Sequence, residues 1–295
     1  MRVEIREPDL SSYEPLVRLR MDRLPRLVRK QAEWPFVHRD AMEVCTFHAA
    51  YDGDTLLGWA NIARWSWFPP GIALINLTVA AAHEGTGVGG ALYRTLLETL
   101  PDGIETLGTA VDDAETTSLE IARGWGFRVN QHGIESELEL TDLPEPVVPD
   151  GVTLEDVSSL EFADEEAVEA MLRDSQTNPE AAEGFVSGLE DYRRIAAKVD
   201  VEIAALARVD GAPAAIIVGE VEDGILGIAY TGVGRAFRGR GIAVALKQYA
   251  HRLAADAGAT VCHTMNEEAN AGIRRVNAEL GYRVTGGMYR LRRPR

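Results

Sequence analysis

Apolar and polar positions follow the same order twice along this chain. An apolar run over 74–79 leads through a short loop into a glycine-rich segment over 84–92, and an apolar run over 225–233 leads in the same way into 238–246. Corresponding positions in these segments are 154 residues apart, and the spacing is 158 for the upstream Asp-Gly pairs and 155 near the end of each copy. Similarity at a fixed spacing indicates that the chain contains one structural unit twice.

Each copy predicts the same order of elements, from one or two helices through a hairpin to a central strand, a glycine-rich turn and an amphipathic helix. The pairs Asp52-Gly53 and Asp210-Gly211 lie between apolar runs, which is the strongest short-range signal for a hairpin. Helices leading into a mixed sheet predict an α/β (α+β) sandwich in each copy. The predicted ranges are helices over 10–40 and 165–199, hairpin strands over 46–64 and 203–220, and a further strand over 106–111 and 260–265.

A proline-rich segment separates the two copies. Residues 141–151 contain three prolines in a short polar stretch, a composition typical of a semi-rigid linker. We therefore predict an N-terminal domain over 1–140, a linker over 141–151 and a C-terminal domain over 152–295.

Composition and charge narrow the function classes. The chain has 295 residues, of which 46% are hydrophobic and 26% charged, a balance typical of globular proteins and sufficient for two domains. Its formal net charge of −16 argues against general nucleic-acid binding, which needs a basic face. An acidic protein suits a cationic or amine substrate.

Membrane and metal signals are not found in the sequence. No apolar stretch approaches the roughly 18–20 residues of a transmembrane helix, and the first residues lack an apolar signal segment. We therefore expect a cytoplasmic protein that does not interact with a membrane. Cys45 and Cys262 fit no CxxC pattern, so we expect two reduced cysteines and no metal site.

The glycine-rich turns are the candidates for chemistry. A strand, such a turn and a helix place free backbone N–H groups at the positive end of a helix dipole, where phosphate or pyrophosphate binds. In the second copy Gly239 and Gly241 let the backbone approach the anion. Arg238 and Arg240 add positive charge and forked hydrogen-bond donors.

Two other nucleotide-binding motifs fit this chain less well. Neither copy has the P-loop pattern GxxxxGK followed by Ser or Thr. The first copy has GxGxxG over 85–90 with Glu105 further on, as in a dinucleotide-binding fold. The second copy has Val244 in place of the third glycine, and a hairpin before the central strand disagrees with a Rossmann unit.

The segment Arg238-Gly-Arg-Gly-Ile-Ala243 resembles the signature of the GNAT acetyltransferase superfamily. In that signature Gln or Arg is followed three residues later by Gly and five residues later by Gly or Ala. Residues 231–233, 264–270 and 277–282 extend the resemblance over most of 225–283, and the duplication extends it to the whole chain. The sequence is similar to the tandem branch of the superfamily, to which mycothiol synthase also belongs.

This resemblance implies two tandem GNAT-like domains, each with a mixed, mainly antiparallel sheet flanked by helices. It implies an N-acyltransferase that moves an acetyl or other small acyl group from acyl-CoA to a primary amine of a small molecule by direct attack. The second copy is the expected catalytic one, because Glu84 stands in the first copy where the second has Arg238 and would repel a phosphate. The residues expected to bind acetyl-CoA or another acyl-CoA are Thr231, Val233, Arg238, Gly239, Arg240, Gly241, Ile242, Ala243, Asn266, Asn270 and Asn277.

For the catalytic groups the sequence offers several candidates. Glu220 at the end of a hairpin strand and His263 on the strand over 260–265, beside the glycine-rich unit, are candidates for the general base. The superfamily often uses a tyrosine acid seven residues beyond the asparagine of the last helix, but seven residues beyond Asn270 this chain has Asn277. Water, Tyr230 or Tyr289 could serve instead. Asn270 and Asn277 could bind the pantetheine arm, or they could cap a helix or face solvent.

Two other functions stay open at this point. One is a biosynthetic acyltransferase that takes its acyl group from the phosphopantetheine arm of an acyl carrier protein. The other is an acyl-CoA-binding sensor or scaffold without catalysis, which the missing tyrosine at Asn277 would fit. Turnover with free acyl-CoA separates the first from our main hypothesis, and CoA binding without turnover would support the second.

Overall fold

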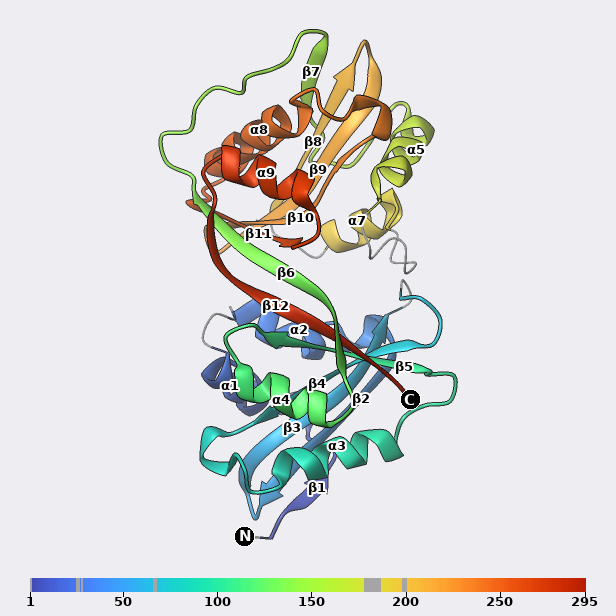
Figure 1. Ribbon diagram of the computed structural model, residues 1–295, viewed down its shortest axis with the longest axis vertical. Coiled ribbons are helices and arrows are strands. Elements are labelled where there is room, and N and C mark those ends of the chain that lie inside the picture. Colours follow the sequence, from blue (N-terminus) through green and yellow to red (C-terminus); the bar gives the residue numbers. More distant parts are fainter. Residues whose placement is uncertain (1, 25–26, 28, 66–67, 178–186, 198–200) are drawn as a thin grey trace. The chain divides into compact units, whose positions relative to one another are not determined.

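The computed structural model describes residues 2–24, 27, 29–65, 68–177, 187–197 and 201–295 (Figure 1). Parts of the predicted helical stretches, at 25–26, 28, 178–186 and 198–199, lie outside these described residues. The chain forms two compact units, each of which is assembled from several segments. Unit 1 consists of Met1–Val111, Thr117–Asn130 and Arg290–Arg295, and unit 2 of Asp112–Thr116 and Gln131–Tyr289.

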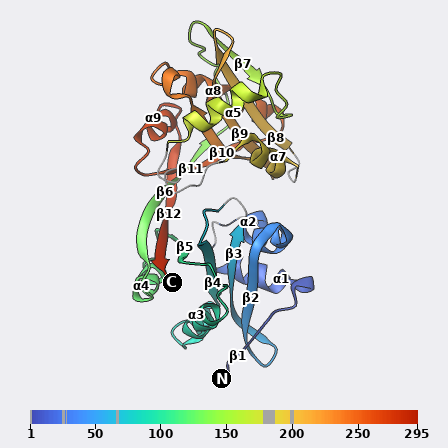
Figure 2. The same cartoon turned by 90° about the vertical axis from the view of Figure 1, so that its right-hand side faces the viewer.

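Unit 1 is a mixed sheet with the hydrogen-bonded order β1-β2-β3-β4-β5-β12. The strands β1 to β4 pair antiparallel, whereas β4 and β5 are parallel. Helix α3 covers one face of the sheet, while α1 and α2 cover the other (Figure 2). The elements are β1 (Glu4–Arg6), α1 (Glu14–Arg23), α2 (Arg29–Val37), β2 (Met42–Asp52), β3 (Thr55–Trp65), β4 (Ile72–Val79), α3 (Val88–Glu98), β5 (Thr106–Asp112) and α4 (Thr116–Gly124).

Unit 2 repeats this plan with the order β12-β6-β11-β10-β9-β8-β7. Alternate residues of β8 belong to two apolar clusters, Ala205 and Ala207 to the one packed with α8, and Ala204 and Leu206 to the one packed with α5 and α7. Both faces of this sheet are therefore covered by helices. The elements are β6 (Arg128–Glu139), β7 (Val152–Asp156), α5 (Glu165–Ser175), α7 (Leu189–Ala196), β8 (Val201–Val209), β9 (Ala212–Glu222), β10 (Ile225–Val233), α8 (Ile242–Asp256), β11 (Val261–Glu267), α9 (Ala271–Glu279) and β12 (Arg283–Pro294).

The predicted fold class is confirmed, and both Asp-Gly hairpin turns are present, with Gly53 and Gly211 at φ of 61° and 82°. The compact units nevertheless differ from contiguous halves of the chain. The strand β6, which ends the first copy, pairs with β11 from Gly133–Glu267 to Glu139–Val261 and so belongs largely to unit 2. The last residues of β12 in turn belong to unit 1, where β5 is the neighbour of that strand.

No helix in the described part of the chain is long and apolar enough to cross a membrane.

Candidate active site

The parallel strands β10 and β11 diverge in the middle of unit 2. Their pairing covers three positions and ends at Gly227–His263, while β10 runs on to Val233 and β11 to Glu267. A β-bulge between Ile228 and Tyr230 interrupts the pairing of β10 with β9 at the same level. The diverging strands leave backbone hydrogen-bonding groups without a strand partner along the edges of a gap, and an extended ligand can pair with them.

The glycine-rich turn lies at the end of β10, beside this gap. Gly239 and Gly241 have φ of 75° and 77°, a backbone conformation that other residues rarely adopt. A Cβ added to Gly239 would meet no heavy atom within 4 Å, so the space in front of the turn is open. Gly241 is the N-cap of α8 and has no side chain that could accept from the first turn of this helix. N–H groups of that turn are therefore left for an anion.

Arg238 has a structural role that the sequence did not predict. Its Nε donates to the carbonyl of Val233 at 3.1 Å, and its Nη2 donates to the carbonyl of Ser175 at 3.1 Å and to Thr177 Oγ1 at 3.0 Å. This arginine therefore ties the end of α5 and the end of β10 to the glycine-rich turn. Arg240 is exposed, so its guanidinium can reach an anion in front of the turn.

Of the other residues around the turn that were predicted to bind acyl-CoA, some can face a ligand only with their backbone and one with its side chain. The side chain of Ile242 is 1% exposed and packs in the α8 core, so only its backbone can face a ligand. Ala243 is half-buried in the first turn of α8. Thr231 Oγ1 is buried and has no hydrogen-bond partner among the described residues, which is unusual for a buried polar atom and fits a ligand contact.

The three predicted asparagines have different environments. The Asn270 side chain caps α9 by accepting from the backbone N–H of Ile273 at 3.4 Å, which is the capping alternative. Asn277 is 5% exposed and accepts a hydrogen bond from Lys247 Nζ at 2.6 Å. It also donates from Nδ2 to Asn266 Oδ1 at 2.7 Å, which places Asn266 at the gap side of a buried amide pair.

A row of acid–base side chains crosses the sheet at the level where β10 and β11 separate. Glu202 on β8 lies opposite Glu220 on β9, Glu220 opposite Gly227 on β10, and Gly227 opposite His263 on β11. Residues directly opposite share one face of a sheet, so the row lies on the face covered by α5 and α7. The Cα atoms of Glu220 and His263 are thus two strand spacings apart, about 10 Å.

The glycine in this row leaves space between the two predicted catalytic groups. A Cβ added to Gly227 would meet only Glu220 Cγ, at 4.0 Å. Burial, followed by the negative charge of Glu220, raises the pKa of Glu202 to about 8. At neutral pH Glu202 therefore keeps its proton. Glu202 was not predicted, because the predicted hairpin begins at residue 203 and a register shift between Ala207 and Arg208 sets which residue of β9 lies opposite Glu202.

The two tyrosines considered as acids lie in different places. Tyr230 is on β10 beside the gap, where its hydroxyl is 2.7 Å from Ser175 Oγ, and burial raises the pKa of this phenol. A raised pKa keeps the phenol protonated near neutral pH, so that it remains a hydrogen-bond donor. Tyr289 stacks on His132 with ring centres 4.4 Å apart, on a strand separated from β11 by β6. Of these two, Tyr230 is the one at the gap.

Unit 1 has the same backbone arrangement with other side chains. Its strands β4 and β5 pair only from Ile72–Thr106 to Leu74–Gly108, and Gly85 and Gly87 have φ of 70° and 91°. The side chain of Glu84, at the position of Arg238, forms an ion pair with Arg23.

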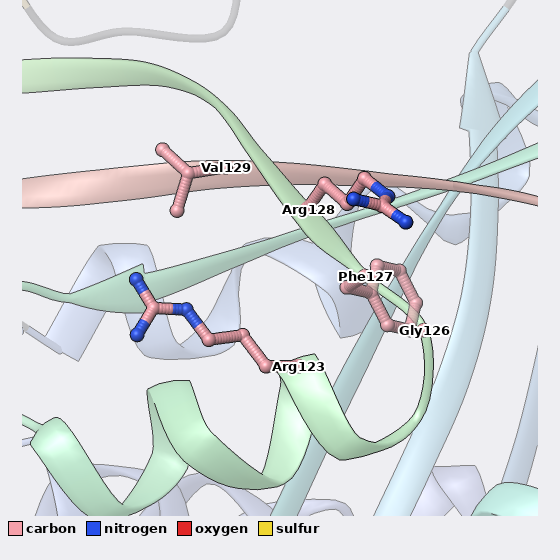
Figure 3. Close-up of a pocket in the computed structure, with 5 residues that line it drawn as sticks. All are labelled: Arg123, Gly126, Phe127, Arg128 and Val129. Atoms are coloured by element: carbon pink, nitrogen blue, oxygen red, sulfur yellow. The ribbon is translucent and has the colours of Figure 1, made fainter.

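A separate hollow of about 360 Å³ lies in unit 1 at the turn from α4 into β6. Figure 3 shows Arg123 projecting from the end of α4 and Arg128 from the start of β6. The five lining residues include no carboxylate, thiol or imidazole, so this hollow does not supply a general base. They are Arg123, Gly126, Phe127, Arg128 and Val129. In the described part of the chain, no group of three or more His, Cys, Asp or Glu side chains could hold a metal ion.

The duplicated mixed sheet, with diverging parallel strands and a glycine-rich turn in each copy, defines the class of protein. Residues 12–127 match the model of the Acetyltransferase (GNAT) family. The resemblance to the GNAT superfamily is therefore confirmed. The matched residues fall in the first copy, although the second copy contains the arginines of the signature.

Solved structures show that the whole chain has the tandem GNAT fold. A GCN5-related N-acetyltransferase from Sphaerobacter thermophilus is 18% identical, with a TM-score of 0.75 over 99% of this chain and 95% of that one. A tandem GNAT protein from the clavulanic acid biosynthesis pathway is 18% identical, with a TM-score of 0.75 over 99% and 98%. The glucosamine N-acetyltransferase region of a fungal multi-domain GH3 beta-N-acetylglucosaminidase is 15% identical, with a TM-score of 0.76 over 99% of this chain and 38% of that one. No curated protein matches the chain.

Proposed function

We propose that the protein is an N-acyltransferase that moves an acetyl or other small acyl group from acyl-CoA to a primary amine of a small molecule, and that unit 2 carries the reaction. One observation carries this proposal. The gap between β10 and β11 has the glycine-rich turn beside one end and the row of Glu220 and His263 at the other. Such a gap suits a ligand with a phosphate end and a reactive end.

The donor would bind along this gap. The N–H groups at the start of α8, together with Arg240, would hold the pyrophosphate, while the diverging edge of β10 would pair with the pantetheine arm. The open space in front of Gly239 and the unpartnered Thr231 Oγ1 support this placement. The acyl-CoA supplies an activated thioester carbonyl.

The proposed reaction is a direct transfer. Glu220, with its neighbour Glu202 protonated, accepts a proton from the substrate ammonium, and the neutral amine attacks the thioester carbon. The new N–C bond forms as the C–S bond breaks, and its electron pair leaves with the sulfur. Backbone N–H groups of β10 are the donors that we assign to the developing oxyanion. We assign protonation of the thiolate to Tyr230 or to water. The nitrogen loses its second proton as the amide forms, and this proton restores the tyrosine or the water.

The acceptor is proposed from charge. The net charge of −16 and the pair of Glu202 and Glu220 favour a cationic amine over an anionic acceptor. One solved structure of the same fold is a glucosamine N-acetyltransferase region, so amino sugars belong among the first amines to test.

The test is turnover of acetyl-CoA over a library of primary amines, with the acylated product detected by mass spectrometry. Product formation with free acetyl-CoA supports the proposal. If product forms only with an acylated carrier protein, the carrier protein and not acyl-CoA is the acyl donor. Tight CoA binding without turnover of any amine by either donor would support the non-catalytic sensor instead.

Charge reversal should lower the affinity for CoA when it is made at the turn of unit 2, but not when it is made at the equivalent turn of unit 1. Arg238→Glu is expected to weaken CoA binding at least tenfold, because it removes three hydrogen bonds that shape the turn and adds a carboxylate beside the pyrophosphate. Glu84→Arg, the matched change in unit 1, should leave CoA affinity within about twofold. Isothermal titration calorimetry measures both. A similar change of CoA affinity in the two variants would contradict the assignment of donor binding to unit 2.

Glu202 should make the protein less stable at alkaline pH. Its folded pKa of about 8 lies above the ordinary value of 4.5, so the folded state binds this proton more tightly and stability falls as pH rises from about 4.5 to about 8. Glu202→Gln removes that loss. We expect its free energy of unfolding to exceed that of the wild type by roughly 1 kcal/mol at pH 8.5, since a partly exposed carboxyl is screened by solvent.

Thermal or urea unfolding at pH 5 and pH 8.5 checks this expectation. The advantage of Glu202→Gln should be larger at pH 8.5 than at pH 5. An equal difference at both pH values would show that Glu202 titrates like an exposed glutamate.

A further inference from the structure

A lysine is fully buried behind the donor site of unit 2. Lys247 on α8 is 0% exposed, and its ammonium lies 4.5 Å from the centre of the Tyr282 ring. The other polar groups packed around it are His251 on the same helix and Cys262 on β11, both within hydrogen-bonding distance of the Tyr282 hydroxyl at 2.6 Å and 3.0 Å. Burial lowers the pKa of Lys247 to about 8. Burying an ammonium costs stability.

The fold does not need a lysine at this position of the helix. The corresponding residue of unit 1 is Tyr93, which is 5% exposed and stacks on Trp125 with ring centres 4.1 Å apart. The residue that corresponds to Asn277 is Ala122, which is buried in unit 1. Tyr93 also accepts a hydrogen bond from Arg293, whose guanidinium lies over its ring. The same fold is thus completed once with a tyrosine, a tryptophan and an arginine, and once with a lysine and an amide. The fully buried lysine is found in the unit whose turn contains Arg238 and Arg240.

Lys247 determines which way two amides point. An ammonium can only donate, so the group 2.6 Å from it must be the oxygen of Asn277 and not its nitrogen. Asn277 Nδ2 is then the atom that faces Asn266, and it donates to Asn266 Oδ1 at 2.7 Å. Asn266 therefore turns its own Nδ2, with two N–H groups, away from the pair.

The Asn266 amide lies at the gap between the diverging strands. It is on β11 beyond the last position paired with β10, on the same face as Cys262, which packs with α8. Thr231, across the gap on β10, is on the same face, because it lies opposite Ile217 of the α8 core. Its buried Oγ1 has no partner among the described atoms. Both side chains therefore offer polar groups to one ligand segment in the gap.

We propose that Lys247 is a positioning residue: it fixes the direction of the Asn277 and Asn266 amides so that Asn266 presents N–H donors to an amide carbonyl of the donor's pantetheine arm. This inference rests on the proposed acyl-CoA-binding function. The chain of contacts selects a ligand with a hydrogen-bond acceptor at this depth of the gap. These contacts do not involve the adenosine of the donor, nor its pyrophosphate, which the glycine-rich turn would bind.

The test compares two ligands that differ in the pantetheine arm alone, CoA and 3′-phospho-ADP. Lys247→Met removes the donor and keeps the volume of the side chain, so the two amides can rotate. Its CoA affinity should fall about tenfold, the loss of one oriented hydrogen bond, while its affinity for 3′-phospho-ADP stays within twofold. Calorimetric titration of each variant with each ligand gives the ratio of the two affinities.

Asn277→Asp tests the same chain while Lys247 stays in place. The aspartate still accepts from Lys247 and forms a buried ion pair, so the fold is maintained, but it cannot donate to Asn266. The ratio of CoA affinity to 3′-phospho-ADP affinity should fall as in Lys247→Met. His251→Phe is the matched control: it changes the same buried cluster without touching either amide, and it should leave the ratio unchanged.

The outcomes separate this inference from the proposed function. A parallel loss of both ligands in Lys247→Met and Asn277→Asp would mean that Lys247 supports the fold only, and no loss of CoA affinity in either variant would also overturn the inference. If Lys247→Met does not fold, Asn277→Asp decides. A wild-type protein that binds neither CoA nor 3′-phospho-ADP would instead refute the proposed function.

Discussion

Replacing Glu220 with glutamine is expected to lower kcat for amine acylation by roughly 100- to 1000-fold, the size of effect typical of losing a general base. Glutamine keeps the shape of the side chain but cannot accept the ammonium proton. Glu220 lies opposite Gly227, the last residue of β10 that pairs with β11, so its carboxylate is at the end of the gap where the thioester is proposed to lie. Steady-state kinetics at saturating acetyl-CoA measure the change.

Two comparisons make this prediction specific. CoA affinity of Glu220→Gln should stay within about twofold of the wild type, because the proposed phosphate site is at the other end of the gap. Glu222→Gln changes a glutamate two residues further along β9, next to the turn into β10, and should retain kcat. A large loss in His263→Asn with none in Glu220→Gln would transfer the role of base to His263. If neither variant altered turnover at any pH, both assignments would be wrong.

Gly241→Val is expected to weaken CoA binding by about 100-fold or more. Gly241 has φ of 77° at the N-cap of α8, and a β-branched residue is strongly disfavoured there, so the turn must move. The moved backbone no longer aims the first N–H groups of α8 at the pyrophosphate. Calorimetric titration with CoA measures the loss.

Gly87→Val in unit 1 is the matched control for this change. Gly87 has φ of 91° and is likewise the N-cap of its helix, α3, so the strain and the loss of stability should be similar in the two variants. CoA affinity should remain near that of the wild type in Gly87→Val. A loss of affinity in Gly87→Val equal to that in Gly241→Val would show that unit 1 also binds the donor.

The asparagines illustrate how far a motif predicts a site. Spacing after the signature identified Asn266, Asn270 and Asn277 together as candidates for the pantetheine arm. The structure separates them, because Asn270 is the N-cap of α9 and its side chain caps that helix, whereas Asn277 lies in the last turn of α9 and is buried against α8. Capping depends on residues next in sequence, so it could be listed as an alternative. The contact with Lys247 could not, since it joins residues on two helices.

By itself the sequence determined the features that depend on neighbouring residues. The duplication, the two Asp-Gly hairpins and the glycine-rich turns could all be predicted, because a positive φ or a helix start is decided by a few adjacent residues. The confirmed fold class follows from the order of these elements.

Only the tertiary structure decided which strands and side chains meet. The pairing of β6 with β11 and the contact of Arg238 with Ser175 and Thr177 join segments far apart in the sequence. These contacts depend on strand register and on the packing of helices, which no local pattern encodes. The buried Lys247 belongs with them: the chain shows a lysine in an amphipathic helix, and only the packed unit turns it toward the Asn277 amide.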